Sequence, residues 1–296
     1  AQGSNSRARG APRRQRGASM AVAVGLLCSA ISLLVGFTAL NIQRHAQRRK
    51  QPCQALNVFG VLLNLVVGPI DMTAYSLAPQ SVLAPLGTLG LVFNMVAGPA
   101  LHDDVVSRSD VLATLLIVVG SAVCLTYGER GAAEGAQTAS DAAMLHYVSV
   151  VGVACVALGT LWARLRQASG HADAVANALF AGILGSTTVV AGKKIGEALA
   201  SGSLLRTAGS LVSLLVIAPL HLVVLNRGIG RHSSALFVPL NAAAGLLANT
   251  LTGVVLYGET PASAAGFGAG VALTVGGALC LSFRGQCARQ APALPR

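Results

Sequence analysis

The sequence GSAVCLTY at Gly120–Tyr127 returns in nearly the same form as GGALCLSF at Gly276–Phe283. Each copy closes an apolar segment, and each follows another apolar segment with a central proline, Pro85 in the first copy and Pro239 in the second. A long-period repeat within membrane-spanning helices is typical of a transporter built from two structurally related halves. The repeat therefore predicts a membrane transporter before any single residue is interpreted.

The composition agrees with a membrane protein. Of the 296 residues, 53% are hydrophobic and only 10% are charged, and the mean hydropathy is +0.66. A soluble domain would have about a quarter of its residues charged, and a bilayer core requires roughly 20 apolar residues per helix. We expect Lys193 and Lys194 to cut the sixth span short, because they directly follow its apolar run. The nine expected spans are approximately residues 20–41, 54–77, 80–100, 110–127, 143–163, 174–192, 204–225, 233–257 and 262–283.

Further correspondences extend the repeat beyond its opening motif. Ser81–Leu86 (SVLAPL) matches Ala235–Leu240 (ALFVPL), and Gly36–Arg44 faintly matches Gly185–Lys193 in its end residues. The first four expected spans thus map onto the last four, with the fifth span as a connector. Equivalent spans are an odd number apart and cross the membrane in opposite senses, which predicts an all-α, polytopic fold with an inverted repeat.

This pattern gives an expected organisation with one transmembrane domain at residues 20–283. The first 19 residues form a basic tail that we expect to be disordered, with the remnant of a transit peptide as the alternative. The expected parts are a tail at 1–19, repeat one at 20–127, a connector helix at 143–163, repeat two at 174–283 and a C-terminal tail at 284–296.

The net charge of +11 is explained by topology rather than by a nucleic-acid partner. The arginines lie in tails and loops, where basic residues orient membrane spans, and their distribution weakly favours an outside N-terminus. No nucleotide-binding loop, metal–thiolate spacing or catalytic triad occurs, so we expect neither an enzyme nor a cofactor. The expected partners are the lipid bilayer and a small ion or solute, in a multi-pass protein of the plasma membrane or an endomembrane.

Asp71 is the acid that lies well inside an expected span. Such a residue costs about 2.5–3.5 kcal/mol on insertion scales, and its presence by default indicates a function. The structural alternative is that Pro69 ends the helix early and leaves Asp71 as a cap at the interface. Oxygen atoms for a cation near Asp71 could come from Asn64, Thr73, Thr88, Asn94, Asn241 and Asn249, although asparagines on membrane helices also bond neighbouring helices.

Pro85 and Pro239 each free a backbone carbonyl, which in lipid must be satisfied by protein or by water in a cavity. We expect them to mark breaks that line a cavity, with a purely packing role as the alternative. Lys193 is expected to snorkel to the interface, to contact an anion, or to form a gate paired with Glu197 or Asp71. Glu259 ends a span and is expected to be a solvated terminal charge, with an acidic vestibule that concentrates cations as the alternative.

Three stretches, in order, resemble the NIPA-type magnesium transporter family of the drug/metabolite transporter superfamily. Ala74–Gly87 is similar to the family signature AYxxAPxxLVTPLG, and Gly185–Gly196 is similar to GSxxVxxxKxxG. Leu225–Pro239 is similar to the LNK…SLVTP stretch, with Glu259 where the family places a later acid. The resemblance implies a nine-span fold of the drug/metabolite transporter type and transport of divalent cations, chiefly Mg²⁺.

One position departs from this family pattern. The family acid within the second span falls on Gly68 here, while Asp71 stands where an asparagine is expected, about one helical turn later and near the same face. Mg²⁺ keeps several waters and needs only one or two carboxylates, so Asp71 remains the candidate metal ligand. The full set of expected pathway residues is Asn64, Asp71, Tyr75, Pro85, Thr88, Asn94, Lys193, Asn226, Pro239 and Asn241.

Three functions therefore stay open. The first is a Mg²⁺ transporter that works by alternating access between the two halves, with Mg²⁺ as substrate rather than cofactor. The second is a carrier of a small organic solute, an anion included, favoured by the paired lysines and the absence of a second acid within a span. The third is a membrane subunit that transports nothing. The Gly266-x₃-Gly270 spacing indicates close helix packing, with a homodimer contact as one use.

Overall fold

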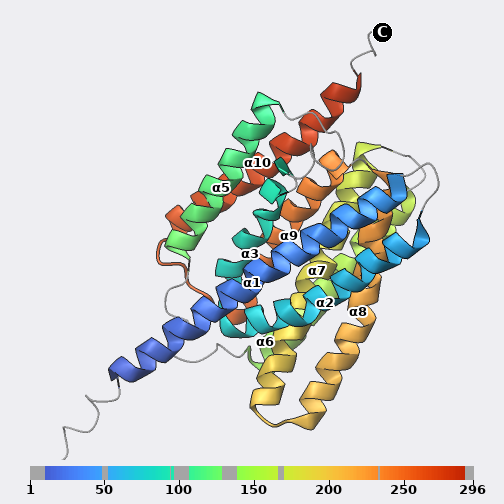
Figure 1. The fold of residues 1–296 in the computed structure, drawn as a ribbon. Helices are drawn as coiled ribbons and strands as arrows, with labels where there is room; N and C mark the ends of the chain where they lie inside the picture. Colours follow the sequence, from blue (N-terminus) through green and yellow to red (C-terminus); the bar gives the residue numbers. More distant parts are fainter. Residues whose placement is uncertain are drawn as a thin grey trace, which may run out of the picture.

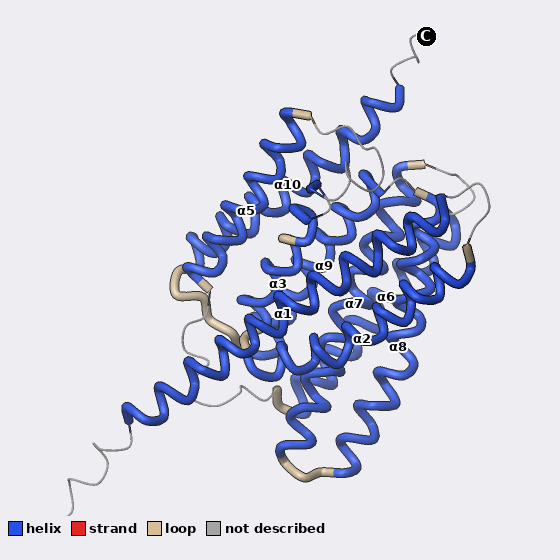
Figure 2. The backbone as a smooth tube through the Cα atoms, in the orientation of Figure 1, coloured by secondary structure: helices blue, strands red, loops and turns tan. Residues whose placement is uncertain are grey.

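Long apolar helices make up nearly all of the structure. The computed structural model describes residues 11–48, 53–93, 95–96, 107–128, 139–165, 170–232 and 234–290, and within these ranges it contains helices and short connections but no strand (Figure 2). The helices are α1 (Ala11–Arg48), α2 (Gln54–Leu77), α3 (Gln80–Thr88), α5 (Arg108–Tyr127), α6 (Asp141–Leu165), α7 (His171–Ala200), α8 (Leu204–Arg231), α9 (Ser234–Tyr257) and α10 (Ala264–Gln290).

Eight of these helices are long and apolar enough to cross a membrane, and α3 belongs to a shorter apolar stretch, Gln80–Phe93. Many large apolar side chains are exposed on the outside of the bundle, for example Leu215 and Val216 of α8, each 65% exposed. A soluble protein would bury such faces, whereas a bilayer solvates them. The expectation of an all-α, polytopic membrane protein is confirmed.

Several helix boundaries differ from the expected ones, and those of α7 and α1 bear on the predictions. α7 continues through Lys193 and Lys194 to Ala200, so the prediction that the lysines cut this span short is wrong. Its physical reason is that both charges have acidic partners within the fold, as described below, and need not reach water. α1 begins at Ala11 and therefore includes residues that the sequence analysis assigned to a tail.

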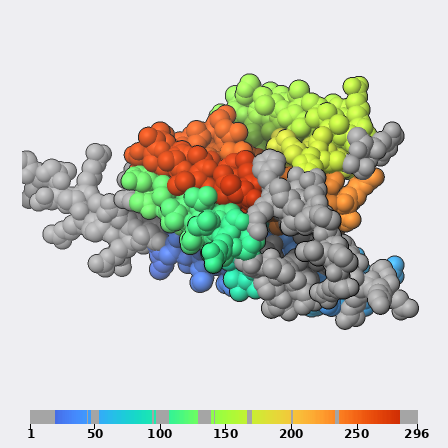
Figure 3. All heavy atoms as spheres, turned by 90° about the horizontal axis from the view of Figure 1, so that it is seen from above, coloured from blue at the N-terminus to red at the C-terminus, as the bar shows by residue number. Residues whose placement is uncertain are grey.

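The helices are arranged around a centre formed by α3, α7 and α9 (Figure 1). α1 lies along α2 on one side, while α6 and α8 pack against α7 on another. α5 and α10 lie side by side and form a further face of the molecule (Figure 3). α1 begins and α10 ends at opposite ends of the bundle (Figure 1), which fits an odd number of crossings.

The two helices that carry the opening repeat, α5 and α10, are in direct contact. A Cβ added to Gly270 would lie 2.7 Å from the Cys124 sulfur and 2.9 Å from the Gly120 carbonyl oxygen, and one added to Gly266 would strike the Tyr127 ring. Tyr127 at the end of α5 contacts Gly266 near the start of α10, and Ala113 near the start of α5 contacts Gly277 further along α10. The two helices are therefore antiparallel. The Gly266-x₃-Gly270 spacing thus serves a contact within the chain.

Several helix ends meet at one end of the bundle. The Ala262 amide donates to the Tyr127 carbonyl over 2.9 Å, which brings the end of α5 to the start of α10. A Cβ on Gly25 of α1 would lie 3.0 Å from the Cβ of Ala78, just after α2. The chain turns there at Pro79 into α3. The candidate site lies at this end.

Candidate functional site

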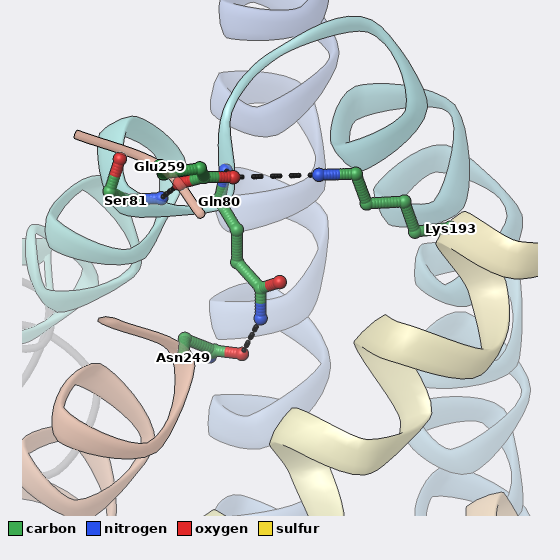
Figure 4. A network of polar contacts seen from close by, with 5 residues as sticks. All are labelled: Gln80, Ser81, Lys193, Asn249 and Glu259. Carbon is green, nitrogen blue, oxygen red and sulfur yellow. Dashed lines mark hydrogen bonds and ion pairs between the residues drawn. The ribbon is translucent and has the colours of Figure 1, made fainter. Parts of the chain in front are cut away.

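Glu259 is the centre of a buried polar network at the start of α3 (Figure 4). The residue is only 3% exposed, although it follows α9 in a connection. Its Oε1 accepts from the Gln80 amide over 2.8 Å and its Oε2 from the Ser81 amide over 2.7 Å. These two amides belong to the first turn of α3, where N–H groups have no partner inside the helix. The carboxylate therefore caps α3 and interacts favourably with the positive end of its dipole.

Lys193 of α7 approaches the same carboxylate from the other side (Figure 4). Its Nζ lies 3.5 Å from Oε1 of Glu259, and the lysine side chain is 7% exposed. The ammonium also lies 3.7 Å from the centroid of the Tyr257 ring, close enough for a cation–π contact. Glu259, which the sequence did not suggest as a partner, is thus an acid that Lys193 meets in the structure. Snorkelling of Lys193 to the interface does not occur.

Its neighbour Lys194 has a separate partner. The Lys194 Nζ lies 2.7 Å from Oε2 of Glu197, on the same helix, and donates to the Ala139 carbonyl over 3.3 Å. Both side chains are partly accessible, at 16% and 13%. The two adjacent lysines of α7 thus occupy different environments, one buried at the α3 cap and one near the surface.

Gln80 extends the network into α9. Its Nε2 donates to Oδ1 of Asn249 over 2.8 Å (Figure 4). The Gln80 Oε1 is buried without a hydrogen-bond partner among the described residues, as is the Tyr257 hydroxyl. Buried oxygens of this kind are uncommon and require an explanation such as a water or an ion.

Asp71 occupies an intramembrane position on α2. The helix continues past Pro69 to Leu77, and the Thr73 hydroxyl donates to the Pro69 carbonyl over 2.9 Å. Asp71 is therefore within the helix and is not a cap, which removes the structural alternative raised by Pro69. The Ser32 hydroxyl of α1 donates to Oδ1 of Asp71.

The structure brings Asp71 and Glu259 into one neighbourhood. α2 and α7 approach closely, since a Cβ on Gly192 would lie 2.6 Å from Cγ of Met72. Tyr75, one helical turn after Asp71, is near enough to interact electrostatically with both carboxylates. The part of α2 that carries Asp71 and Tyr75 thus lies beside the part of α7 that carries Lys193, which in turn meets the α3 cap.

The remaining expected residues lie elsewhere or apart from this site. Thr88 donates to the Pro85 carbonyl over 2.6 Å, and Ser121 of α5 lies 3.1 Å from the Thr88 hydroxyl, so this proline is part of a buried contact between helices. Pro239 is also buried. Half-buried positions on α2, α8 and α9 are held by Asn64, Asn226 and Asn241, and Asn94 is outside the described residues.

Two residues of the site were not predicted in these roles. The expectation that Glu259 is a solvated terminal charge is wrong, because the carboxylate folds back onto α3 and is buried. Ser32 was not singled out, since a serine on an apolar helix carries no signal before its partner is placed. The sequence signal that could have drawn attention to Glu259 is its position directly after a span. In the structure it meets the Pro79–Gln80 turn, where the short helix α3 begins.

The oxygen atoms of these side chains suit a hard cation better than a metal ion that is bound by thiolates. Among the described residues, no group of three His, Cys, Asp or Glu side chains could hold a metal ion. The site instead has two carboxylates, Asp71 and Glu259, with amide and phenol oxygens beside them. Mg²⁺ is bound in this manner, by one or two carboxylates and retained waters.

Comparisons with known proteins agree with this geometry. A family model described as magnesium transporter NIPA matches residues 24–280. No curated protein and no solved structure matches the chain. The matched range covers all the described residues of the site and all the helices except the outer ends of α1 and α10. The matched family is one of transporters and not of enzymes. The chain belongs to the NIPA magnesium transporter family, and it is an integral, multi-pass membrane protein.

Proposed function

We propose that this protein carries Mg²⁺ across the membrane and that Asp71 is the carboxylate which the ion meets. The observation that supports this role most directly is the position of Asp71 inside α2, where the Ser32 hydroxyl donates to it. An acid at this depth is costly unless it serves a function. Membership of a magnesium transporter family supports the choice of ion.

The proposed pathway follows the polar positions of α2, α7 and the two proline-containing helices. Asn64, Asp71 and Tyr75 are spaced by seven and four residues along α2 and share one helical face. Pro85, Thr88, Asn226, Pro239 and Asn241 are further candidates on α3, α8 and α9. The unpartnered Oδ1 of Asn241 is the observation in favour of that residue.

Alternating access between two inverted halves is the proposed mechanism. The antiparallel contact of the equivalent helices α5 and α10 supports it, because an inverted repeat requires opposite senses for such a pair. An inside-negative potential of 100 mV supplies about 4.6 kcal/mol to a divalent ion, twice the value for one charge. Uptake then needs no second coupling ion.

The alternative of an organic anion carrier has lost its main support. That interpretation rested on two lysines available to an anion, but Lys193 faces Glu259 and Lys194 faces Glu197. A non-transporting subunit would have no use for a carboxylate within α2. A homodimer through Gly266 and Gly270 is not part of the proposal, because both glycines pack against α5.

The test is Mg²⁺ uptake into proteoliposomes that contain a fluorescent Mg²⁺ reporter, under an imposed inside-negative potential. Wild type is compared with Asp71→Asn, which keeps the shape of the side chain and a hydrogen-bond acceptor for Ser32. We expect potential-dependent uptake by the wild type and its loss in the variant. Absence of uptake by correctly folded wild type would refute Mg²⁺ transport.

A further inference from the structure

We propose that Lys193 is a tethered cation which occupies the Glu259 carboxylate in the resting protein and which the transported cation displaces. This inference rests on the proposed function and adds to it a second cation-binding position. Figure 4 shows Glu259, Gln80 and Asn249 of this position, with Lys193 as its built-in occupant. The Tyr257 ring, which lies beside the ammonium, completes it.

The Glu259 charge does not depend on Lys193. Each carboxylate oxygen accepts a backbone N–H from the first turn of α3, over 2.8 and 2.7 Å. Hydrogen bonds of this kind, together with the helix dipole, stabilise an anion without any cation. The carboxylate therefore keeps both of these hydrogen bonds when the ammonium leaves.

The contact from Lys193 to Glu259 is longer than the two backbone hydrogen bonds that hold the carboxylate. The 3.5 Å separation of the ammonium from Oε1 of Glu259 exceeds the 2.7 Å between Lys194 and Glu197, and it exceeds the usual length of about 2.7–2.9 Å for such a bond. Tyr257 attracts the ammonium through its ring face rather than through a directional bond. The lysine side chain has a flexible four-carbon stem, so its ammonium can move away from Glu259 without a change of the backbone.

Two buried oxygens at this position have no partner in the resting arrangement. Gln80 is 0% exposed and Tyr257 is 3% exposed, and neither the Gln80 Oε1 nor the Tyr257 hydroxyl has a hydrogen-bond partner among the described residues. A hydrated Mg²⁺ would supply water O–H donors to acceptors of this kind. These oxygens are what distinguishes the position from an ordinary buried ion pair.

The tether also explains how an ion could be released. A bare carboxylate at a helix N-terminus would offer a divalent cation a strong attraction, and conduction requires that binding be weak enough for the ion to leave. When the ammonium returns to Glu259, it competes directly with the bound ion. Lys193 would thereby lower the affinity of the site and speed release.

The test compares Lys193→Gln with the matched control Lys194→Gln, which removes the adjacent charge outside the α3 cap. Mg²⁺ affinity is measured as the apparent Kd for thermal stabilisation of the detergent-solubilised protein, and uptake is measured in proteoliposomes. We expect Lys193→Gln to bind Mg²⁺ about tenfold more tightly, because a like charge has been removed from the site, and to have a lower maximal uptake rate. Lys194→Gln should change both much less, because the Lys194 Nζ lies 6.0 Å from the Tyr257 centroid and pairs with Glu197 instead of Glu259.

A second variant covers the case in which Lys193→Gln does not fold. Tyr257→Phe keeps both charges and the ring beneath the ammonium but removes the unpartnered hydroxyl, and should weaken Mg²⁺ binding about threefold. Unchanged Mg²⁺ affinity in the folded variants, with transport intact in the wild type, overturns this inference alone. The expected changes in affinity without transport by the wild type support the site but refute the proposed function. Absence of Mg²⁺ binding to wild type and variants overturns both.

Discussion

The Lys193–Glu259 pair should respond very differently to the loss of each partner. Glu259→Gln removes the charge that compensates the buried Lys193 ammonium, and it weakens the hydrogen bonds of the two α3 amides. Breaking a buried pair in this way costs about 3–5 kcal/mol. Lys193→Gln leaves Glu259 with both of its backbone hydrogen bonds, each worth about 1.5–3 kcal/mol as bonds to a charged group. We therefore expect a cost of only about 1–2 kcal/mol for the lysine variant.

The measurement is the free energy of unfolding in mixed micelles, obtained by titration with a denaturing detergent. The double variant Lys193→Gln/Glu259→Gln should cost less than the sum of the single variants by about 1–3 kcal/mol, because it leaves no uncompensated lysine charge. Lys194→Gln, whose partner is near the surface, should change the free energy by less than about 1 kcal/mol. An equal or larger cost for Lys193→Gln than for Glu259→Gln, or additive costs in the double variant, would refute the argument that α3 holds the acid independently.

Two further predictions concern positions outside the site. Gly270→Ala should lower the free energy of unfolding by about 1–3 kcal/mol, because the new Cβ would lie 2.8 Å from the Cys124 amide nitrogen. The control Gly268→Ala places a Cβ with no atom within 4 Å, and it should be nearly neutral in the same titration. Burial lowers the pKa of His232 below its usual value of 6.5, despite the opposing effect of Asp173, so the unfolded chain takes up a proton there more readily than the folded chain. Melting temperatures should therefore fall as the pH drops through 6.5, and His232→Asn should reduce that fall; equal falls in both proteins would contradict this assignment.

The fold was largely predictable from local sequence properties. Apolar segments of membrane-spanning length, separated by charges and by Pro/Gly breaks, indicate the helices directly, because hydrocarbon imposes a minimum length and internal hydrogen bonding on each. The repeated motif also identified α5 and α10 as equivalent helices, and they prove to be partners in space. The same reasoning placed Asp71 within a span, where the structure has it.

The contacts that define the site were not predictable in the same way. Lys193 was expected to end α7, since hydropathy treats a charged residue as exposed to water. Hydropathy takes no account of an acidic partner that lies 66 residues later in the chain. Glu259 was expected to be solvated because it follows the end of a helix. In the structure its two carboxylate oxygens accept hydrogen bonds from backbone amides at the start of α3. Both errors have one origin, since compensation of a buried charge depends on tertiary contacts that sequence spacing does not encode. Ser32 was missed for the same reason.

The cap on α3 has a consequence for how the protein is made. The Gln80 amide receives its acceptor from a residue 179 positions later in the chain. During synthesis α3 therefore enters the membrane before the carboxylate that satisfies its first turn exists, and those N–H groups must stay near headgroups or water in the meantime. The N-terminal half can assume its final depth only after α9 has been inserted. Assembly is thus completed by the second half, and a ribosome that stops before Glu259 leaves the first half unfinished.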